Sequence, residues 1–440
     1  MKISYKEIYL VIFILLILFS CAMNQQAMFR AIDAAVSKND FQTSIEIIEE
    51  AQAGKSPLYN YNNAISLYMD LGLMRHFAHD YKQSTDNLHN AERLISEAFT
   101  KSITQSVSTY IVNDNTREYP GEDFEDIYLS VFNALNYYKM GNLDGALVEV
   151  RKLTLPSGKL EMLQRKYEEP NEKAKKENEN ALKRAQDSQG ASLPEVKYVS
   201  FANSALARYL SMLFYRSVGN FDAARIEHEQ LQAAFTTQPA IYNHAFPSSP
   251  NSIQPLIDNV QDMSTLSIIS FVGLSPIKEE RFFPMYFPFF EDPTLRFAQI
   301  RLPVLTARPN RIDRVEIVVS EQRYNMELLE NMGNVIMDTF NARYSQIFLK
   351  TYLRTLTKYI ATDISSKAIA GKDNEGLAGL LTLTGRIISD VSERADIRMS
   401  RMLPNKAYIC NINLEAGTYD VVVNYYAGRT LIKSETEENV

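Results

Sequence analysis

The two cysteine thiols are the first side chains to consider as reactive groups, because of their type and their positions. Cys21 lies just after a run of apolar residues, 8–19, from which Ser20 separates it, and Lys2 and Lys6 precede the run. A charged start followed by about a dozen apolar residues is typical of a signal peptide and is short for a membrane span. Cys410 lies on the apolar side of an alternating pattern, so we expect it to be buried in a core as a small apolar group.

The residues before Cys21 are Leu18, Phe19 and Ser20, with an apolar residue at minus three and a small one next to the cysteine. This pattern resembles the lipobox of bacterial lipoproteins. The resemblance implies that the Cys21 thiolate takes a diacylglycerol and that the signal peptide, residues 1–20, is then cut away. Two or three acyl chains would hold the protein firmly on a membrane. The alternatives are an ordinary cleaved signal and an anchor helix in which Cys21 plays no part.

The residue after Cys21 is Ala22 rather than Asp. In a Gram-negative cell, the resemblance to lipoprotein sorting signals implies the periplasmic side of the outer membrane. The net charge of −7 argues against nucleic acid as a partner. We expect the partners to be the membrane, through the lipid on Cys21, and other cell-envelope proteins. A lipidated Cys21 leaves no internal disulfide, and no cysteine-based metal site is expected.

Residues 31–235 have the pattern of helices joined by short polar turns. In the clearest unit, 137–153, Gly141 gives the turn a permissive backbone and Ala146 is small where two helices would cross. This unit resembles the second half of a tetratricopeptide repeat. Three other segments align with it, and their small crossing residues are Ser44, Ser84 and Ala224. We therefore predict a tetratricopeptide-like solenoid whose concave face binds peptides or proteins, or which serves as a spacer from the membrane.

Composition divides the rest of the chain. Residues 21–30 would be the lipid anchor and tether. A charged insertion, 159–188, interrupts the helical half as a solvated helix or a docking arm. A stretch rich in proline and serine predicts a linker at 236–262. A C-terminal α+β domain would cover 263–433, and an acidic tail would follow at 434–440.

In the C-terminal half the apolar pattern changes to that of strands around one long helix. Apolar residues three or four apart predict this helix from Gln322 to Ser366, and a second helix is expected at 375–395. Alternating patterns predict strands at 314–319, 408–414 and 419–425, with Gly417 as a hairpin turn between the last two. The predicted fold is mostly α, with a small antiparallel-sheet domain that contains a long helix.

Short motifs in this half occur in order at 273–280, 396–398, 403–404 and 414–419. They resemble the C-terminal signature of a functionally uncharacterised family of bacterial lipoproteins with N-terminal tetratricopeptide-type repeats. Ser400 stands where that family usually has Trp. The resemblance implies a cell-envelope location and says little about activity.

Two segments are candidate contact sites for a partner. Asp396 and Arg398 could form an ion pair that fixes the end of the chain, or could contact a partner. The second segment contains two prolines that keep it out of a helix or a central strand. It could fill a core, cover a protein or touch lipid. Its aromatic residues are Phe282, Phe283, Tyr286, Phe287, Phe289 and Phe290.

The sequence has no phosphate-binding glycine loop, no Gly-x-Ser-x-Gly and no His-Glu-x-x-His. His76 and His79 lack an evident third ligand, so we interpret them as turn or surface histidines. No catalytic residue, metal or cofactor is predicted. The expected function is a non-enzymatic, lipid-anchored scaffold or assembly factor. The alternatives are an envelope glycan- or small-molecule-binding module and a cell-wall enzyme whose site is assembled from distant residues.

Overall fold

The fold is that of a computed structural model, which describes residues 25–54, 58–59, 61–104, 117–168, 199–252, 263–286, 297–370 and 394–440. Several predictions made from the sequence lie outside these ranges. They are lipidation of Cys21, the contacts of Phe287, Phe289 and Phe290, residues 169–188 of the charged insertion, residues 253–262 of the linker, and almost all of the predicted helix at 375–395.

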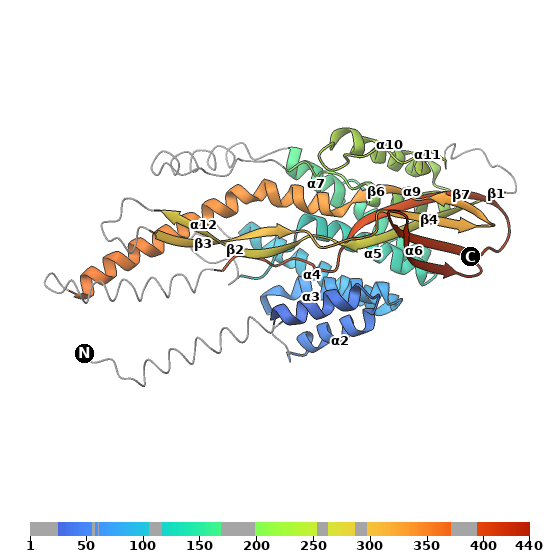
Figure 1. The fold of residues 1–440 in the computed structure, drawn as a ribbon. Helices are drawn as coiled ribbons and strands as arrows, with labels where there is room; N and C mark the ends of the chain where they lie inside the picture. The colour runs from blue at the N-terminus through green and yellow to red at the C-terminus, as the bar shows by residue number, and fades with distance from the viewer. Residues whose placement is uncertain are drawn as a thin grey trace.

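Helices come first along the chain, and antiparallel strands follow around one long helix (Figure 1). The first part holds α2 (Phe41–Gln52), η1 (Tyr61–Asn63), α3 (Ala64–Phe77), α4 (Tyr81–Thr104), α5 (Asp123–Lys139), α6 (Leu143–Thr154), α7 (Lys159–Glu168), α9 (Ala205–Ser217), α10 (Phe221–Thr237) and α11 (Ser249–Ser252). The second part holds β1 (Met263–Leu274), β2 (Ile277–Tyr286), β3 (Phe297–Thr306), β4 (Arg314–Val319), β5 (Gln322–Asn325), β6 (Glu327–Asn331), α12 (Met332–Ala370), β7 (Pro404–Glu415), β8 (Val421–Ala427) and β9 (Thr430–Glu437). The mixed α and antiparallel β composition agrees with the predicted class.

The helical half uses one kind of turn four times. In each turn one residue adopts a left-handed backbone, and the next residue caps the following helix with a side-chain oxygen. The left-handed residues are Asn39 (φ 58°), His79 (φ 64°), Gly141 (φ 73°) and Gly219 (φ 73°). The capping residues are Asp40, Asp80, Asn142 and Asn220, each of which accepts from the backbone N–H three residues later. Because the turn reverses the chain, consecutive helices pair as hairpins.

The paired helices cross at small residues. The predicted crossing positions are all 0% exposed, and they are Ser44, Ser84, Ala146 and Ala224. The Ser84 hydroxyl donates to the Gly72 carbonyl at 2.6 Å. A Cβ on Gly72 would lie 2.6 Å from Leu88, so glycine is what lets α3 and α4 approach this closely. Burial at the four predicted positions is thereby confirmed.

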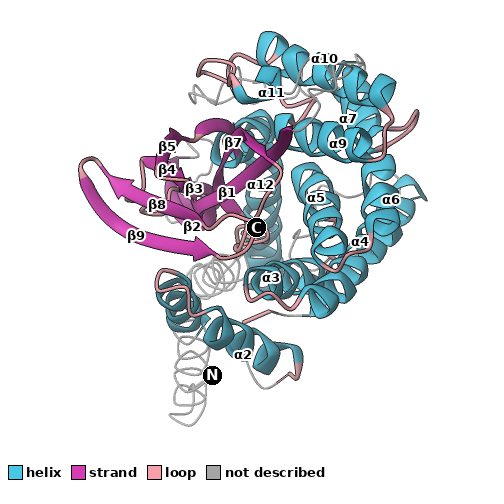
Figure 2. Cartoon of the chain, turned by 90° about the vertical axis from the view of Figure 1, so that its right-hand side faces the viewer, coloured by secondary structure: helices cyan, strands magenta, loops and turns pink. Residues whose placement is uncertain are grey.

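The hairpins form an arc, and the C-terminal half lies inside it. Figure 2 shows α3, α5 and α9 on the inner side of the arc, facing the strands, and α4, α6 and α10 on the outer side. The rings of Phe132 in α5 and Phe271 in β1 are 5.0 Å apart. The Tyr209 hydroxyl in α9 donates to Asn411 Oδ1 in β7 at 2.7 Å. The protein's own strands therefore occupy the inner face, which the repeat pattern of the sequence predicts to be open to partners.

Two sheets pack inside the arc, one behind the other. The first has the strand order β1-β7-β6, and the second has the order β5-β4-β8-β9. β7 is buried on both sides: Ala407 and Ile409 join the core with the helices, and Cys410 and Ile412 join the core between the sheets. Cys410 is 5% exposed, as predicted, and burial raises the pKa of its thiol to about 11.

The predicted hairpin at Gly417 is wrong. β7 pairs with β1 and β6, whereas β8 pairs with β4 and β9, so the chain crosses from one sheet to the other at this point. The region predicted as an acidic tail, 434–440, is also ordered. β9 extends through Glu437, and Val440 exchanges two backbone hydrogen bonds with Tyr419. The alternation of apolar residues located β4, β7 and β8 but carried no information on their partners.

The predicted helix over 322–366 begins ten residues too early, because β5 and β6 precede α12. Leu329 fits the helical spacing, but it belongs to β6, which pairs with β7. At the strand–helix junction, a Cβ on Gly333 would lie 2.3 Å from Asn405 Oδ1, so this glycine allows close packing rather than a kink.

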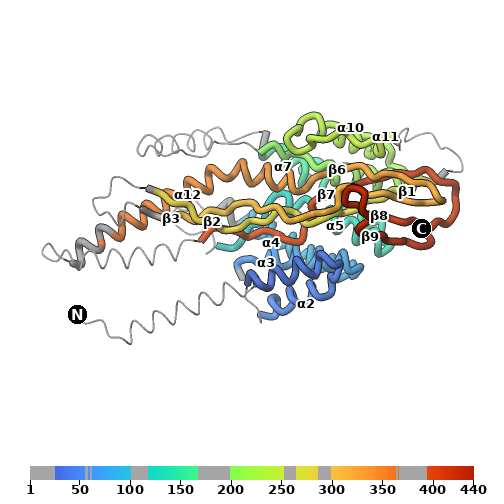
Figure 3. The backbone as a smooth tube through the Cα atoms, in the orientation of Figure 1, coloured from blue at the N-terminus to red at the C-terminus, as the bar shows by residue number. Residues whose placement is uncertain are grey.

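Beyond the sheets, α12 runs alongside the two-stranded β2–β3 ribbon and extends away from the body (Figures 1 and 3). The ribbon and the helix share a small core that includes Ile300, Leu302, Tyr352 and Tyr359. Among the described residues, no helix combines the length and apolar character that crossing a bilayer would require.

The segment predicted as a linker is packed where the structure describes it, up to residue 252. Gln238 Oε1 accepts from the backbone N–H of Ala202 at 2.7 Å and of Asn203 at 3.1 Å. Ile241 and Tyr242 are 0% and 3% exposed. The predicted domain boundary therefore does not coincide with a break in the core.

Glu330 is a buried carboxylate that binds the helices to β6. It accepts hydrogen bonds from the Tyr128 hydroxyl, from Ser204 Oγ at 3.0 Å, from Leu206 N at 2.7 Å and from the Tyr242 hydroxyl at 3.1 Å. Burial raises the pKa of Glu330, and the hydrogen bonds oppose that rise. A buried acid with four donors fixes both the position and the direction of β6 against the arc.

Replacing Glu330 with Ala should lower the free energy of unfolding by about 3 kcal/mol or more, because four buried donors, all in the helical half, would lose their acceptor. Urea denaturation measures the effect. Glu50→Ala, at an exposed position, is the control and should change stability by less than about 0.5 kcal/mol. Equal stabilities for the two variants would contradict the role given to Glu330.

Candidate functional site

The predicted contact residues Asp396 and Arg398 face into the protein. Arg398 Nε lies 2.8 Å from Asp396 Oδ1, and Arg398 Nη2 lies 2.8 Å from Oδ2. Arg398 is 7% exposed, and its Nη1 donates to the Arg117 carbonyl at 2.6 Å. The pair therefore holds the segment before β7 against the helices, and this geometry supports the structural interpretation of the two residues.

Ser400 continues the same contact. Its hydroxyl donates to Asp70 Oδ1 at 2.6 Å, and its backbone N–H donates to Glu125. Asp70 also accepts from Arg401 N at 2.8 Å. Ser400 is 0% exposed, and a Trp at this position would displace the buried carboxylates of α3 and α5. Ser400 is thus part of a polar, closely hydrogen-bonded contact between the segment before β7 and the helices.

The described part of the aromatic–proline segment lies in β2. Pro284 faces Gln299 in the two-stranded ribbon, where an edge strand tolerates a residue without an N–H. Phe283 packs against the small core beside α12. Phe282 is 56% exposed, and Arg301 lies over its ring at 4.6 Å from the centroid. The structure thus divides the described aromatics between core and surface.

A pocket of about 510 Å³ lies on the outer face, where α6 ends and α7 begins. Three aliphatic side chains beside it are about half exposed: Val148 (48%), Leu155 (49%) and Met162 (50%). Arg151 also lines the pocket and has no acidic partner among the described residues. The first residues of the predicted charged insertion form α7, and its buried Leu160 anchors this wall of the pocket. The surface combines an apolar patch with one available cation.

A cluster of charged side chains borders the pocket between α4, α6 and α7. Lys152 Nζ lies 2.8 Å from Glu92 Oε2 and 2.9 Å from Glu149 Oε1. Lys159 Nζ lies 2.8 Å from Glu92 Oε1 and 2.7 Å from Asp126 Oδ1. Burial alone would raise the pKa of Glu92, but the two ammonium groups outweigh it and lower that pKa to about 2.

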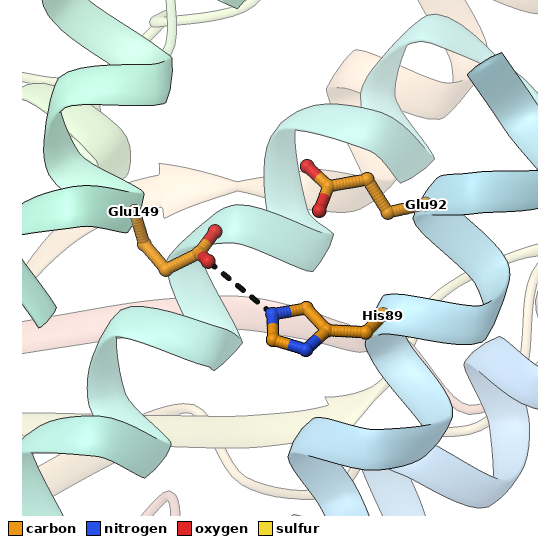
Figure 4. A group of neighbouring side chains, drawn as sticks. All are labelled: His89, Glu92 and Glu149. Atoms are coloured by element: carbon orange, nitrogen blue, oxygen red, sulfur yellow. Dashed lines mark hydrogen bonds and ion pairs between the residues drawn. The ribbon is translucent and has the colours of Figure 1, made fainter. Parts of the chain in front are cut away.

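His89 completes the cluster. Figure 4 shows the His89 ring and Glu92 reaching from one helix toward Glu149 on another. His89 Nε2 lies 3.5 Å from Glu149 Oε1. Glu149 is 1% exposed, and its Oε2 is buried without a hydrogen-bond partner among the described residues. The donor set consists of one imidazole and two carboxylates.

The sequence pattern drew attention to His76 and His79 and did not indicate this cluster. His76 is half-buried, its Nδ1 lies 2.6 Å from Asn136 Oδ1, and desolvation lowers its pKa to about 4. His79 occupies a left-handed turn, as interpreted from the sequence. No sequence signal identified the cluster, because it depends on α4 and α6 lying side by side; His89 and Glu149, like Glu92 and Lys152, are 60 residues apart.

Comparison with protein-family models, with curated proteins and with solved structures found no match for this chain.

Glu125 accepts a hydrogen bond from the Ser400 N–H, and it makes the contact between the helices and the segment before β7 sensitive to pH. Burial, and then the nearby Glu122 carboxylate, raise its pKa from about 4.5 to about 7. Between these values the folded protein holds a proton that the unfolded chain has lost, so the free energy of unfolding falls as pH rises. The raised pKa of Glu125 contributes about 3 kcal/mol to the free energy of unfolding at low pH, and this contribution is lost as the pH rises through about 7.

Glu125→Gln should remove this part of the pH dependence. Urea denaturation at pH 5 and pH 8 measures it, and the wild type should lose more stability over this interval than the variant. Glu50→Gln, at an exposed site, should behave as the wild type. A variant that loses as much stability as the wild type between the two pH values would contradict the assignment.

Proposed function

We propose that this protein is a lipid-anchored, non-enzymatic component of the bacterial cell envelope that holds a partner protein on the outer face of its helical arc. One observation carries the proposal. The protein's own strands fill the inner face, whereas the outer face presents half-exposed Val148, Leu155 and Met162 around a pocket. Exposed apolar groups that surround a pocket are typical of interaction sites.

The chemistry of the pocket indicates what the partner presents. Leu155 and Met162 suit an apolar side chain, and Arg151 suits a carboxylate beside it. The helix hairpins are, in this proposal, degenerate tetratricopeptide-like repeats. Their common turn and their buried small crossing residues support this.

The ionisation of the acid that lines the pocket supports a non-enzymatic role for the pocket. General acid–base catalysis near neutral pH works best with a group whose pKa is near the working pH. The acid that lines the pocket, Glu92, is held ionised by Lys152 and Lys159, and its pKa is about 2. It would therefore exchange protons poorly in that range.

The partner site can be tested with a photoreactive residue in place of Leu155 in the lipidated protein, in the cells that make it. We expect one discrete crosslinked protein. Either Arg151→Glu or Met162→Glu should lower the crosslink about tenfold, because each removes one half of the recognition surface. A photoreactive residue at Leu431, which is 51% exposed on β9, is the matched control. Equal crosslinking from positions 155 and 431, or indifference to both substitutions, would refute this site.

The anchor can be tested separately at Cys21. Labelling cells with a palmitate analogue should mark the wild type, and Cys21→Ser should abolish the label because the hydroxyl is a poor acceptor for the glyceryl group. Cys410→Ser, which changes the only other cysteine, should keep the label. Mass spectrometry of the wild-type N-terminus decides the matter: an unmodified, uncleaved end would rule out the lipid anchor.

A further inference from the structure

His89, Glu92 and Glu149 offer ligand atoms that all lie within 4.8 Å of one another. His89 and Glu92 are one turn apart on α4, and Glu149 faces them from α6 (Figure 4). Imidazole nitrogen and carboxylate oxygen are ligands that Zn²⁺ takes at about 2.0–2.2 Å, so small side-chain movements would bring the three groups onto one ion.

Glu149 gives a second, independent indication. Its Oε2 is buried and has no hydrogen-bond partner among the described residues, although the side chain is only 1% exposed. A buried carboxylate oxygen without a donor is costly unless a cation or another partner satisfies it. Figure 4 shows this carboxylate on the side of Glu149 that faces His89 and Glu92.

A cation already lies between the two carboxylates. The Lys152 ammonium is 2.8 Å from Glu92 and 2.9 Å from Glu149, and its side chain is 34% exposed. Lysine can therefore leave the cluster by rotating toward the pocket, which it also lines. Lys159, which is 15% exposed, would stay with Glu92 and Asp126.

We propose that His89, Glu92 and Glu149 form a site for a divalent transition-metal ion, with Lys152 as the internal cation that the metal displaces. Neutral His89 and two carboxylates around a divalent ion have no net charge, so the exchange leaves the cluster electrically balanced once Lys152 turns outward. Three protein ligands leave one coordination position for water. The site does not depend on the pocket's proposed partner.

Isothermal titration of the complete protein with Zn²⁺ alone tests the site. We expect one ion to bind per chain at micromolar free concentration. His89→Ala and Glu149→Gln should each weaken binding about tenfold or more, because each removes a ligand. Lys152→Met should tighten binding by a similar factor, because it removes the competing ammonium while keeping the aliphatic stem. A purely structural ion-pair cluster would not respond in this way.

His79→Ala is the matched control, because His79 lies at the turn that precedes α4 and belongs to no cluster of potential ligands among the described residues. It should bind Zn²⁺ as the wild type does. His89 has a side chain that is 40% exposed, so its removal should leave the fold intact, and thermal denaturation checks this. The inference is overturned if the wild type binds no Zn²⁺, if Lys152→Met binds no more tightly, or if His79→Ala weakens binding as much as His89→Ala.

Discussion

Carboxylates buried between the helical arc and the C-terminal half are the constraint on which the rest of the structure depends. Asp70 in α3, Glu125 in α5 and Glu330 in β6 are each 0% exposed. Asp70 and Glu330 each accept several hydrogen bonds across this boundary, and Glu125 accepts one, from the Ser400 N–H. Taking an ionisable group out of water is unfavourable unless its oxygens are satisfied. Apolar packing alone would tolerate a sliding contact, whereas these acids accept only donors at fixed positions. They therefore set where the segment before β7 and the strand β6 lie against the arc.

That constraint also determines which surface is free. Once α3, α5 and α9 are joined to the strands, the inner face of the arc is part of the core, and the outer helices alone face away from the sheets. A helical arc with an open inner groove could enclose a peptide, but this arc encloses its own sheet. Within the arc, the outer helices α4, α6 and α10, together with α7, are the part that another molecule could reach without separating the helices from the strands.

Local features of the fold could be predicted from the sequence, but pairing could not. The sequence predicts the turns at Gly141 and Gly219 and the small residues at the helix crossings. Both features restrict the residue type at fixed positions. The sequence does not predict the partners of β7 and β8, since an alternating strand looks the same in either sheet. Leu329 fitted a helical stripe because strand and helix share some apolar spacings, and only pairing with β7 decided between them. The cluster of His89, Glu92 and Glu149 depended on which helices lie side by side, which no single segment encodes.

Two contacts of the arc differ in a way that bears on function. The inner seam is the contact between the helices and the strands, and the outer seam is the contact between α4 and α6. At the inner seam, acids such as Glu330 are bonded to tyrosines, serines and backbone groups that are themselves buried, so an exchange of partners would require the core to open. At the outer seam between α4 and α6, the acids are bonded to lysines, and Lys152 is 34% exposed. A partly exposed ammonium can be replaced by another cation at small cost, because water takes it up as it leaves. Reversible binding of an ion is therefore compatible with the contact between α4 and α6, and incompatible with the buried contact between the helices and the strands.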